Sequence, residues 1–273
     1  MRQYLLLLSL ITYSNLFAQN QIPTISNLQV LFDESTKIVT VDYDLFDAEN
    51  EMMDVHFLAS NDAGISYLLN TANATGDLGA AITSGTGKTI TWDATGQLTV
   101  AGDYQIKVIA DDGFQIDIQE IVDQVDSVRL LNSLTFIEGI RHRTANPTHL
   151  EAVKDTIEQR FLTAGIDAFR SDFTFGNYTA QNVIGHMEGA LHSDTTYIID
   201  GHFDTVNDSP GADDTGSAVA GMLEAMRVLA PYQFNKTIRF VGFDLEESGL
   251  LGSIDYNSNN IADAETVKGV FNF

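Results

Sequence analysis

Residues 197–206 read YIIDGHFDTV, an apolar run that stops abruptly at Gly201 and His202. A short apolar run of this kind predicts a buried strand, with the polar residues that follow at its carboxyl end. Ligands of open α/β sheets bind beyond the carboxyl ends of the strands, which makes His202 and Asp204 candidate site residues. A neutral imidazole can bind zinc through one ring nitrogen while a carboxylate such as Asp204 holds the other. For this pair alone, the interpretation as two surface side chains is still favoured.

A second polar cluster, PGADDTGS at residues 210–217, comes just before a predicted helix. Its glycines allow a tight turn, and a carboxylate at the tip of such a turn can bridge two metal ions, one per oxygen. The alternative is that Asp213 or Asp214 caps the helix that follows.

A third cluster, the pair Glu246 and Glu247, follows a strand predicted for residues 237–243. Apolar residues flank the pair on both sides, so we expect it to be buried. Two adjacent buried carboxylates are costly unless a cation lies beside them. On an irregular segment, one can ligate a metal while the other acts as general base toward the attacking water. The three clusters together predict His, Asp and Glu side chains meeting at one edge of a sheet.

The chain around these clusters alternates between strand-like and helix-like apolar patterns. Strands are predicted for residues 181–186, 196–200, 237–243 and 267–273, and helices for 125–139, 147–164 and 217–229. Thr148 is expected to cap the second helix with Glu151 as its capping-box partner, and Gly165 is expected to end it. We therefore expect an α/β domain over residues 127–273, with a mostly parallel central sheet covered on both faces.

Residues 19–115 follow a different pattern, in which apolar and polar residues alternate with a period of two. Strands are expected at residues 37–43, 54–58, 89–92 and 104–109, separated by clusters of Asp, Asn and Gly. This predicts an all-β sandwich with Trp92, the only tryptophan, at the centre of its core. The stretches SNDAGISY, GTGKTITWDA and VIADDG resemble immunoglobulin-like or fibronectin-type modules. The chain is therefore multidomain, with a linker expected at residues 116–126.

The composition excludes several classes of function. A formal net charge of -24 argues against binding to nucleic acid and to anionic membrane surfaces. The chain has no cysteine, so any metal must be held by His, Asp and Glu side chains. Residues 1–18 have the pattern of a signal peptide, with Arg2, an apolar run at 4–11 and a cleavage site after Ala18. We expect a secreted protein, periplasmic or extracellular, without a membrane span.

The segments IIDGHFDTV, PGADDTGSAVAGMLEAMR and IRFVGFDLEESGLLGS closely resemble the secreted co-catalytic zinc aminopeptidases of the zinc-dependent exopeptidase superfamily. The stretch YTAQNVIGHMEG is similar to an early strand of the same family. This resemblance implies a site with two zinc ions, in which His202 and Glu247 are ligands and Asp214 is the bridging carboxylate. It also implies that Glu246 is the general base, that Asp204 orients His202, and that a cis peptide bond follows Asp214.

The pattern of that family continues with a further Asp and a further His, and this chain has no histidine after His202. We therefore expect residues 127–273 to be the N-terminal part of a zinc peptidase domain. In this interpretation the chain is an inactive fragment of an enzyme that hydrolyses N-terminal peptide bonds of peptides or proteins.

Three alternatives remain open at this level. The first is another activity of the same superfamily, a carboxypeptidase or a glutaminyl cyclase. The second is a non-catalytic binding protein on a peptidase scaffold, and the third assigns the function to the N-terminal module as a carbohydrate-binding or wall-binding domain. His142 and His149 are interpreted as surface residues. The oligomeric state and the preferred substrate side chain are not predicted.

Overall fold

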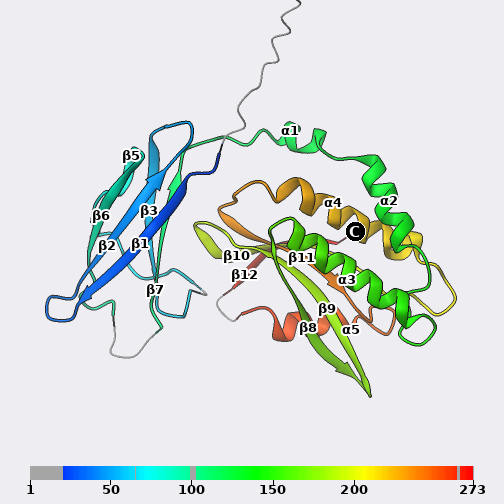
Figure 1. The fold of residues 1–273 in the computed structure, drawn as a ribbon. Helices are drawn as coiled ribbons and strands as arrows, with labels where there is room; N and C mark the ends of the chain where they lie inside the picture. The colour runs from blue at the N-terminus through cyan, green and yellow to red at the C-terminus, as the bar shows by residue number, and fades with distance from the viewer. Residues whose placement is uncertain (1–20, 65, 99–102, 263–264, 273) are drawn as a thin grey trace, which may run out of the picture.

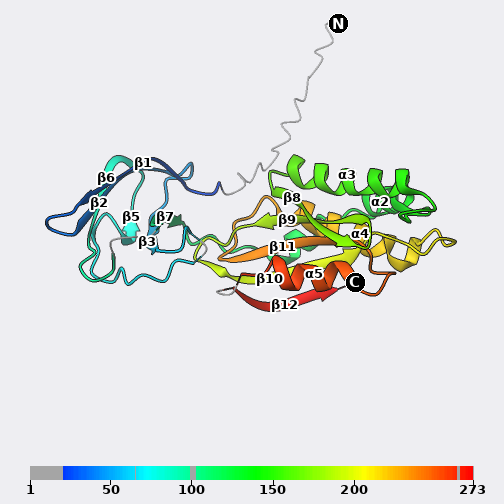
Figure 2. The ribbon, with the colours of Figure 1, turned by 90° about the horizontal axis from the view of Figure 1, so that it is seen from below.

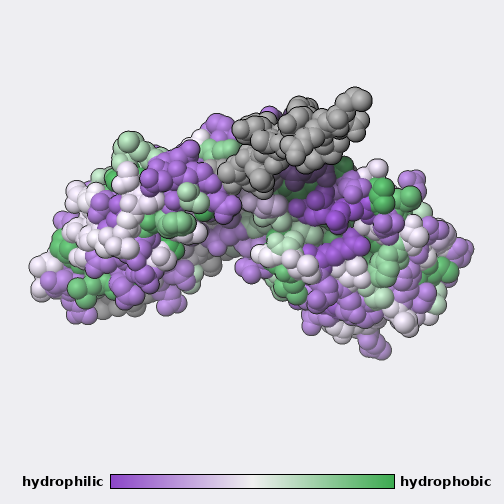
Figure 3. Space-filling model, turned by 45° about the horizontal axis from the view of Figure 1, so that its top comes forward, coloured by the Kyte–Doolittle hydropathy of each residue, from purple (hydrophilic) through white to green (hydrophobic). Residues whose placement is uncertain are grey.

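The computed structural model describes residues 21–64, 66–98, 103–262 and 265–272 (Figure 1). The signal peptide predicted for residues 1–18 lies outside these described residues. Two lobes are visible in Figures 1 and 2, an all-β lobe and a lobe in which helices flank a sheet. Figure 3 shows hydrophilic side chains spread over both lobes, with hydrophobic patches scattered between them.

Two antiparallel sheets form the N-terminal lobe. The strands are β1 (Thr24–Asp33), β2 (Ile38–Phe46), β3 (Met53–Ser60), β4 (Thr75–Gly76), β5 (Gly79–Ile82), β6 (Gly85–Asp93) and β7 (Gln105–Asp111). One sheet has the order β1-β2-β6-β4 and the other β5-β3-β7. Side chains from both sheets share one apolar cluster that includes Trp92, which is fully buried as expected and packs edge-on against Phe57 at 5.7 Å between ring centroids.

The four strands predicted for this lobe correspond to β2, β3, β6 and β7, whereas β1, β4 and β5 were not predicted. β1 lacks a clean two-residue period, because its pairing with β2 shifts register between Ser26 and Gln29 and most of its side chains are exposed. The cluster at residues 84–87, expected to be a turn, instead contains the first residues of β6. The immunoglobulin-like assignment of this lobe stays a prediction.

The segment expected to be a linker contains a short helix, α1 (Ile118–Asp123). Asp117 caps it by accepting a hydrogen bond from the backbone N–H of Gln119 at 2.8 Å. After the helix, the carbonyl of Gln124 accepts a hydrogen bond from Arg227 at 2.5 Å. An ion pair between Lys107 of β7 and Glu188 also joins the two lobes.

A five-stranded sheet forms the centre of the C-terminal lobe, with the order β12-β10-β11-β9-β8. Its strands are β8 (Asp167–Phe175), β9 (Tyr178–Met187), β10 (His192–His202), β11 (Lys236–Phe243) and β12 (Thr266–Asn272). β10 runs parallel to β11 and β12, but β9 runs antiparallel to both β11 and β8. The sheet is therefore mixed rather than mostly parallel, because the two residues between β8 and β9 leave room only for a hairpin.

Helices cover both faces of this sheet (Figure 2). One apolar cluster joins the sheet to α2 (Ser127–Ile137), α3 (Pro147–Thr163) and α4 (Ser217–Leu229). A second cluster joins the opposite face to α5 (Leu251–Asn259) through Tyr256. α4 has the bounds predicted for it, while α5 was not predicted. No helix among the described residues combines the length and the apolar character that a membrane crossing needs.

The start of α3 corrects one expectation. Its N-cap is Asn146, whose side chain accepts from the backbone N–H of His149 at 3.2 Å, so Thr148 does not cap the helix. Pro147 occupies the first helical position, where its missing N–H costs nothing. The predicted end is confirmed, since Gly165 follows the last turn with a left-handed φ of +78°.

Candidate metal centre

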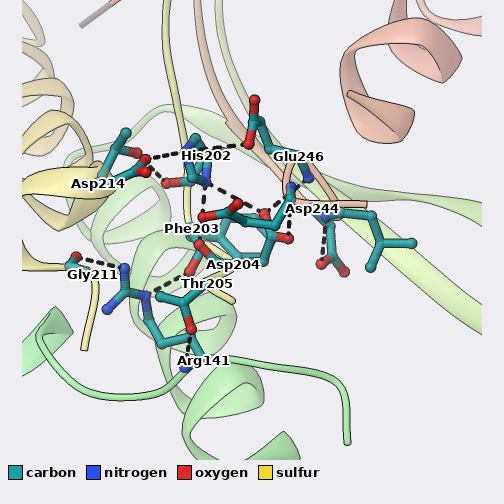
Figure 4. A network of polar contacts seen from close by, with 12 residues as sticks. Arg141, His202, Phe203, Asp204, Thr205, Gly211, Asp214, Asp244 and Glu246 are labelled. Atoms are coloured by element: carbon teal, nitrogen blue, oxygen red, sulfur yellow. Dashed lines mark hydrogen bonds and ion pairs between the residues drawn. The ribbon is translucent and has the colours of Figure 1, made fainter. Parts of the chain in front are cut away.

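Neighbouring parallel strands bring the predicted polar clusters to one edge of the sheet (Figure 4). His202, the last residue of β10, lies beside Phe243, the last residue of β11, in the parallel register. Glu246 follows the end of β11, and Asp214 lies in the turn before α4. We call the set His202, Asp204, Asp214, Glu246 and Glu247 the metal cluster.

His202 contacts three carboxylates of this cluster. Its Nδ1 lies 3.1 Å from the backbone oxygen of Asp204 and 3.4 Å from Oδ1 of the same residue. Its Nε2 lies 3.0 Å from Oδ1 of Asp214 and 3.7 Å from Oε2 of Glu246. The backbone oxygen of Asp204 can only accept a hydrogen bond. Nδ1 of His202 therefore carries a proton and donates a hydrogen bond to this oxygen. Nε2 therefore faces the carboxylates of Asp214 and Glu246.

Asp204 is buried and links His202 to the glutamate pair. Its Oδ1 accepts a hydrogen bond from the backbone N–H of Glu246 at 3.0 Å, and its Oδ2 accepts from the N–H of Glu247 at 3.3 Å. One carboxylate therefore holds both the imidazole and the backbone on which the two glutamates lie. Its predicted role toward His202 thus extends to a second segment of the chain.

The turn that carries Asp214 contains the cis peptide bond to Thr215 that the resemblance implied. The hydroxyl of Thr215 donates to the carbonyl of His202 at 2.6 Å, which ties the turn to the end of β10. The N-cap of α4 is Gly216, and no side chain accepts a capping hydrogen bond from the first turn of this helix. Neither Asp213 nor Asp214 therefore caps this helix, and the capping alternative is wrong.

Charges within the metal cluster shift the pKa values of His202 and Glu247. Burial alone lowers the pKa of His202, but the hydrogen bond and charge of Asp204, together with Glu246 and Asp214, raise it to about 8. Burial raises the pKa of Glu247, and the negative charge of Asp214 raises it further. Carboxylates are thus crowded here around a single imidazole, an arrangement that a divalent cation would relieve.

The donor atoms fit zinc, which binds imidazole nitrogen and carboxylate oxygen. His202, Glu246 and Glu247 each offer one ligand atom, and these atoms lie within 4.8 Å of one another. Asp214 contacts the same ring nitrogen of His202 as Glu246 does. The structure thus brings all five predicted site residues together, while the division into ligands and base stays a prediction. His142 and His149 lie outside the cluster.

Several residues around the metal cluster were missed by the sequence analysis. Lys154 of α3 and Asp244 form a buried ion pair at 3.4 Å directly before the glutamate pair, and burial raises the pKa of Asp244. Asp244 also accepts from the backbone N–H of Leu245 at 2.9 Å. Lys154 directly follows the buried Val153 in α3. A charged residue next to the apolar face of a helix is a sequence feature that could have indicated a buried ion pair. Arg141, which lies in the loop between α2 and α3, has no such signal.

A cavity of about 660 Å³ lies elsewhere, between α2, α3 and α4. Arg129, Arg160 and Arg227 line its wall, and no member of the metal cluster does. The metal cluster therefore does not lie in this cavity.

Comparison with known proteins connects the C-terminal third of the chain to peptidases. Residues 182–273 match the sequence profile of "Peptidase family M28". Aminopeptidase YwaD of Bacillus subtilis (strain 168) is 42% identical over 101 residues, which cover 36% of this chain and 22% of YwaD. Leucine aminopeptidase 2 of Trichophyton rubrum is 35% identical over 100 residues, covering 36% of this chain and 20% of that protein. The chain thus spans about a fifth of the length of these curated relatives.

Two solved structures give the structural side of this comparison. The aminopeptidase from Aneurinibacillus sp. strain AM-1 has a TM-score of 0.49 at 15% identity, covering 56% of this chain and 71% of that one. BSAP, a zinc aminopeptidase from Bacillus subtilis, has a TM-score of 0.33 at 39% identity, covering 36% of this chain and 24% of that one. The sequence similarity to family M28 covers the segment from Asn182 onward, which carries the metal cluster.

Proposed function

We propose that residues 127–273 form the metal site of a zinc-dependent aminopeptidase, which hydrolyses N-terminal peptide bonds of peptides or proteins. The observation that carries this proposal is the crowding of carboxylates around Nε2 of His202 at the carboxyl ends of β10 and β11. The similarity of residues 182–273 to family M28 and to proteins named aminopeptidases supports the reaction class.

His202, Asp214 and Glu247 are the proposed ligands, with Asp214 shared between two zinc ions. Zinc bound there would supply a Lewis acid toward water and toward the scissile carbonyl. His202 offers its Nε2 because Asp204 keeps the proton on Nδ1. Asp214 presents a largely exposed carboxylate, which leaves its oxygens accessible.

Glu246 is the proposed general base. Its carboxylate takes a proton from the attacking water and later donates that proton to the leaving amine. The backbone N–H groups of Glu246 and Glu247 are held by Asp204, so the base is fixed relative to His202. The side chain of Glu246 is half-buried, which keeps it within reach of solvent and substrate.

Zinc binding by the purified chain tests the site itself. Isothermal titration of the metal-free protein is expected to show zinc binding that His202→Ala abolishes. His192→Ala is the matched control, because His192 is an exposed histidine at the opposite end of the same strand. Equal zinc affinity in the wild type and the His202→Ala variant would remove the basis of the proposal.

Substrate choice separates the aminopeptidase from the other activities of its superfamily. With the full-length enzyme to which this segment is proposed to belong, hydrolysis of a leucine chromogenic substrate with a free amine, but not of its N-blocked analogue, is expected. Removal of the last residue from an N-blocked peptide with a free carboxylate indicates a carboxypeptidase. Release of ammonia from a peptide with N-terminal Gln indicates a glutaminyl cyclase.

Export is a further part of the proposal and rests on the pattern of residues 1–18. Expression with the native N-terminus in a bacterial host is expected to give a mature protein that begins at Gln19, as read by N-terminal sequencing. Retention of Met1 in the mature protein would reject export by this segment.

A further inference from the structure

Arg141 lies in the loop between α2 and α3 and is fully buried. Among the described residues, its guanidinium group donates only to backbone carbonyls. The acceptors are Phe203 at 2.6 Å from Nε, Ile137, Gly139 and Pro210 at 2.7, 2.9 and 2.9 Å from Nη1, and Gly211 at 2.9 Å from Nη2. Figure 4 shows this side chain directly below the metal cluster.

These carbonyls belong to the two segments that carry the predicted ligands. Phe203 directly follows His202, whereas Pro210 and Gly211 open the turn that leads to Asp214. The backbone of Arg141 strengthens the first connection, because its N–H donates to the hydroxyl of Thr205 at 2.9 Å and its carbonyl accepts from the N–H of Thr205 at 3.0 Å. One side chain thus joins the end of β10 to the turn before α4.

The charge of Arg141 has no carboxylate within ion-pair distance among the described residues. Burial lowers its pKa to about 10, while the more distant charges of Asp204 and Asp214 act in the opposite direction. The group therefore stays protonated at neutral pH, and the carbonyl dipoles provide its local compensation. Planar guanidinium groups with five N–H donors suit this arrangement, whereas the three N–H donors of lysine project from a single nitrogen.

The packing around Gly211 shows how closely these segments are fitted. Gly211 has a φ of +55°, and a Cβ atom there would lie 2.4 Å from Cγ2 of Thr205 and 2.8 Å from Nη2 of Arg141. The turn, the end of β10 and the guanidinium group are therefore in contact at one point, with no room for a side chain.

We propose that Arg141 is a positioning residue of the metal centre, which sets the separation between Nε2 of His202 and the carboxylate of Asp214 by joining their two backbone segments. The inference rests on the proposed function, since it assigns Arg141 a role in holding ligands for zinc. Arg141 itself contacts neither the metal nor the substrate. Arg141 raises metal affinity by fixing the backbone geometry of the two segments, and this effect is distinct from its contribution to the stability of the fold.

Arg141→Lys tests this assignment, with Arg239→Lys as the matched control. Arg239 is a half-buried arginine of β11 that donates to the carbonyl of Asn260 at 3.0 Å and pairs with Glu265 at 3.0 Å, away from the metal cluster. Both variants are expected to unfold at lower temperature without metal. Arg141→Lys alone is expected to lose zinc affinity, by about 10- to 100-fold. The affinities are measured by competition with a fluorescent chelator on the full chain, well below both unfolding temperatures.

A milder pair of variants covers the case in which Arg141→Lys does not fold. Thr205→Val removes the hydroxyl that accepts from the backbone of Arg141, while Thr196→Val removes a buried hydroxyl of β10 that has no hydrogen-bond partner among the described residues. Thr205→Val is expected to weaken zinc binding, and Thr196→Val is expected to leave it unchanged. Zinc affinity that falls equally in each variant and its control, or in neither, overturns the inference. Absence of zinc binding by the wild type rejects the proposed function instead.

Discussion

Two regions of the C-terminal lobe gather carboxylates, and only one of them contains its own permanent cation. In the arginine cluster, Glu151, Asp155 and Glu158 of α3 surround the guanidinium group of Arg170 on β8. Asp155 lies 2.5 Å and Glu158 2.9 Å from guanidinium nitrogens, and Glu151 makes a third contact. In the metal cluster, the carboxylates surround an imidazole that is neutral when it ligates a metal.

The pKa values of Glu151 in the arginine cluster and of Glu247 in the metal cluster shift in opposite directions. Burial alone raises the pKa of Glu151, but the hydrogen bond from Arg170 and the charges of Lys154 and Arg170 outweigh it and lower the pKa. Burial and the charge of Asp214 both raise the pKa of Glu247. The carboxylates of the arginine cluster therefore have a cationic partner within the chain, whereas Glu247 has no Lys or Arg within ion-pair distance among the described residues.

The largest expected effect is on catalysis, where a substitution in the metal cluster is expected to act and one in the arginine cluster is not. In the proposed full-length enzyme, Glu246→Gln is expected to keep zinc and to lose about two or more decades of kcat/KM, because the amide cannot accept the proton of the attacking water. Glu158→Gln, from the arginine cluster, is the matched control and is expected to leave turnover unchanged. Steady-state kinetics with metal analysis on both variants checks this, and unchanged turnover by Glu246→Gln would reject its assignment as base.

A smaller effect concerns the free energy of unfolding in the presence of zinc. Zinc at about 100 times its dissociation constant is expected to stabilise the wild type by about 2.7 kcal/mol. Asp214→Asn is expected to diminish this gain because it removes a carboxylate that contacts His202, whereas the neighbouring Asp213→Asn keeps it. Urea unfolding with zinc and with chelator provides the measurement. Equal gains in both variants would contradict a ligand role for Asp214.

Removal of the permanent cation is expected to destabilise the fold whether or not zinc is present. Arg170→Met is expected to cost about 1–2 kcal/mol, because it leaves three carboxylates together, two of which are well exposed and screened by water. Arg129→Met serves as the control, since Arg129 is exposed and lies 3.7 Å from its one carboxylate partner. Urea unfolding in chelator measures both, and a wild-type stability for Arg170→Met would contradict the comparison.

The smallest expected effect is on the pH dependence of the free energy of unfolding. The folded-state pKa of Glu151 lies below its ordinary value of 4.5, so the stability that it contributes is present above that value and is lost as the pH falls through the folded-state pKa. Arg170→Met is expected to flatten this part of the stability profile below about pH 4.5, because it removes the hydrogen bond that lowers the pKa. Urea midpoints at a series of pH values compare the variant with the wild type, and parallel profiles would contradict the prediction.

Sequence patterns indicated where the members of the metal cluster lie because each follows or precedes a strongly patterned element, and the family resemblance distinguished Asp214 from Asp213. The apolar run of β10 ends at His202, and the helix after Asp214 has the bounds that its periodicity predicted. By contrast, α5 was missed because its sequence, LGSIDYNSN, contains few apolar residues and buries only Gly252 and Tyr256. The mixed character of the sheet was also missed, because a run of apolar residues does not show the direction of its neighbour.

The local elements and the residue types at their ends can be predicted from the sequence, because burial periodicity and turn chemistry are properties of neighbouring residues. Which distant groups meet is set by the fold. Arg141 contacts carbonyls at Phe203 and Gly211, more than sixty positions away, and Asp204 holds the backbone of Glu246. Such contacts depend on how strands and loops are placed in space, and the identity of a single buried arginine or aspartate does not reveal them.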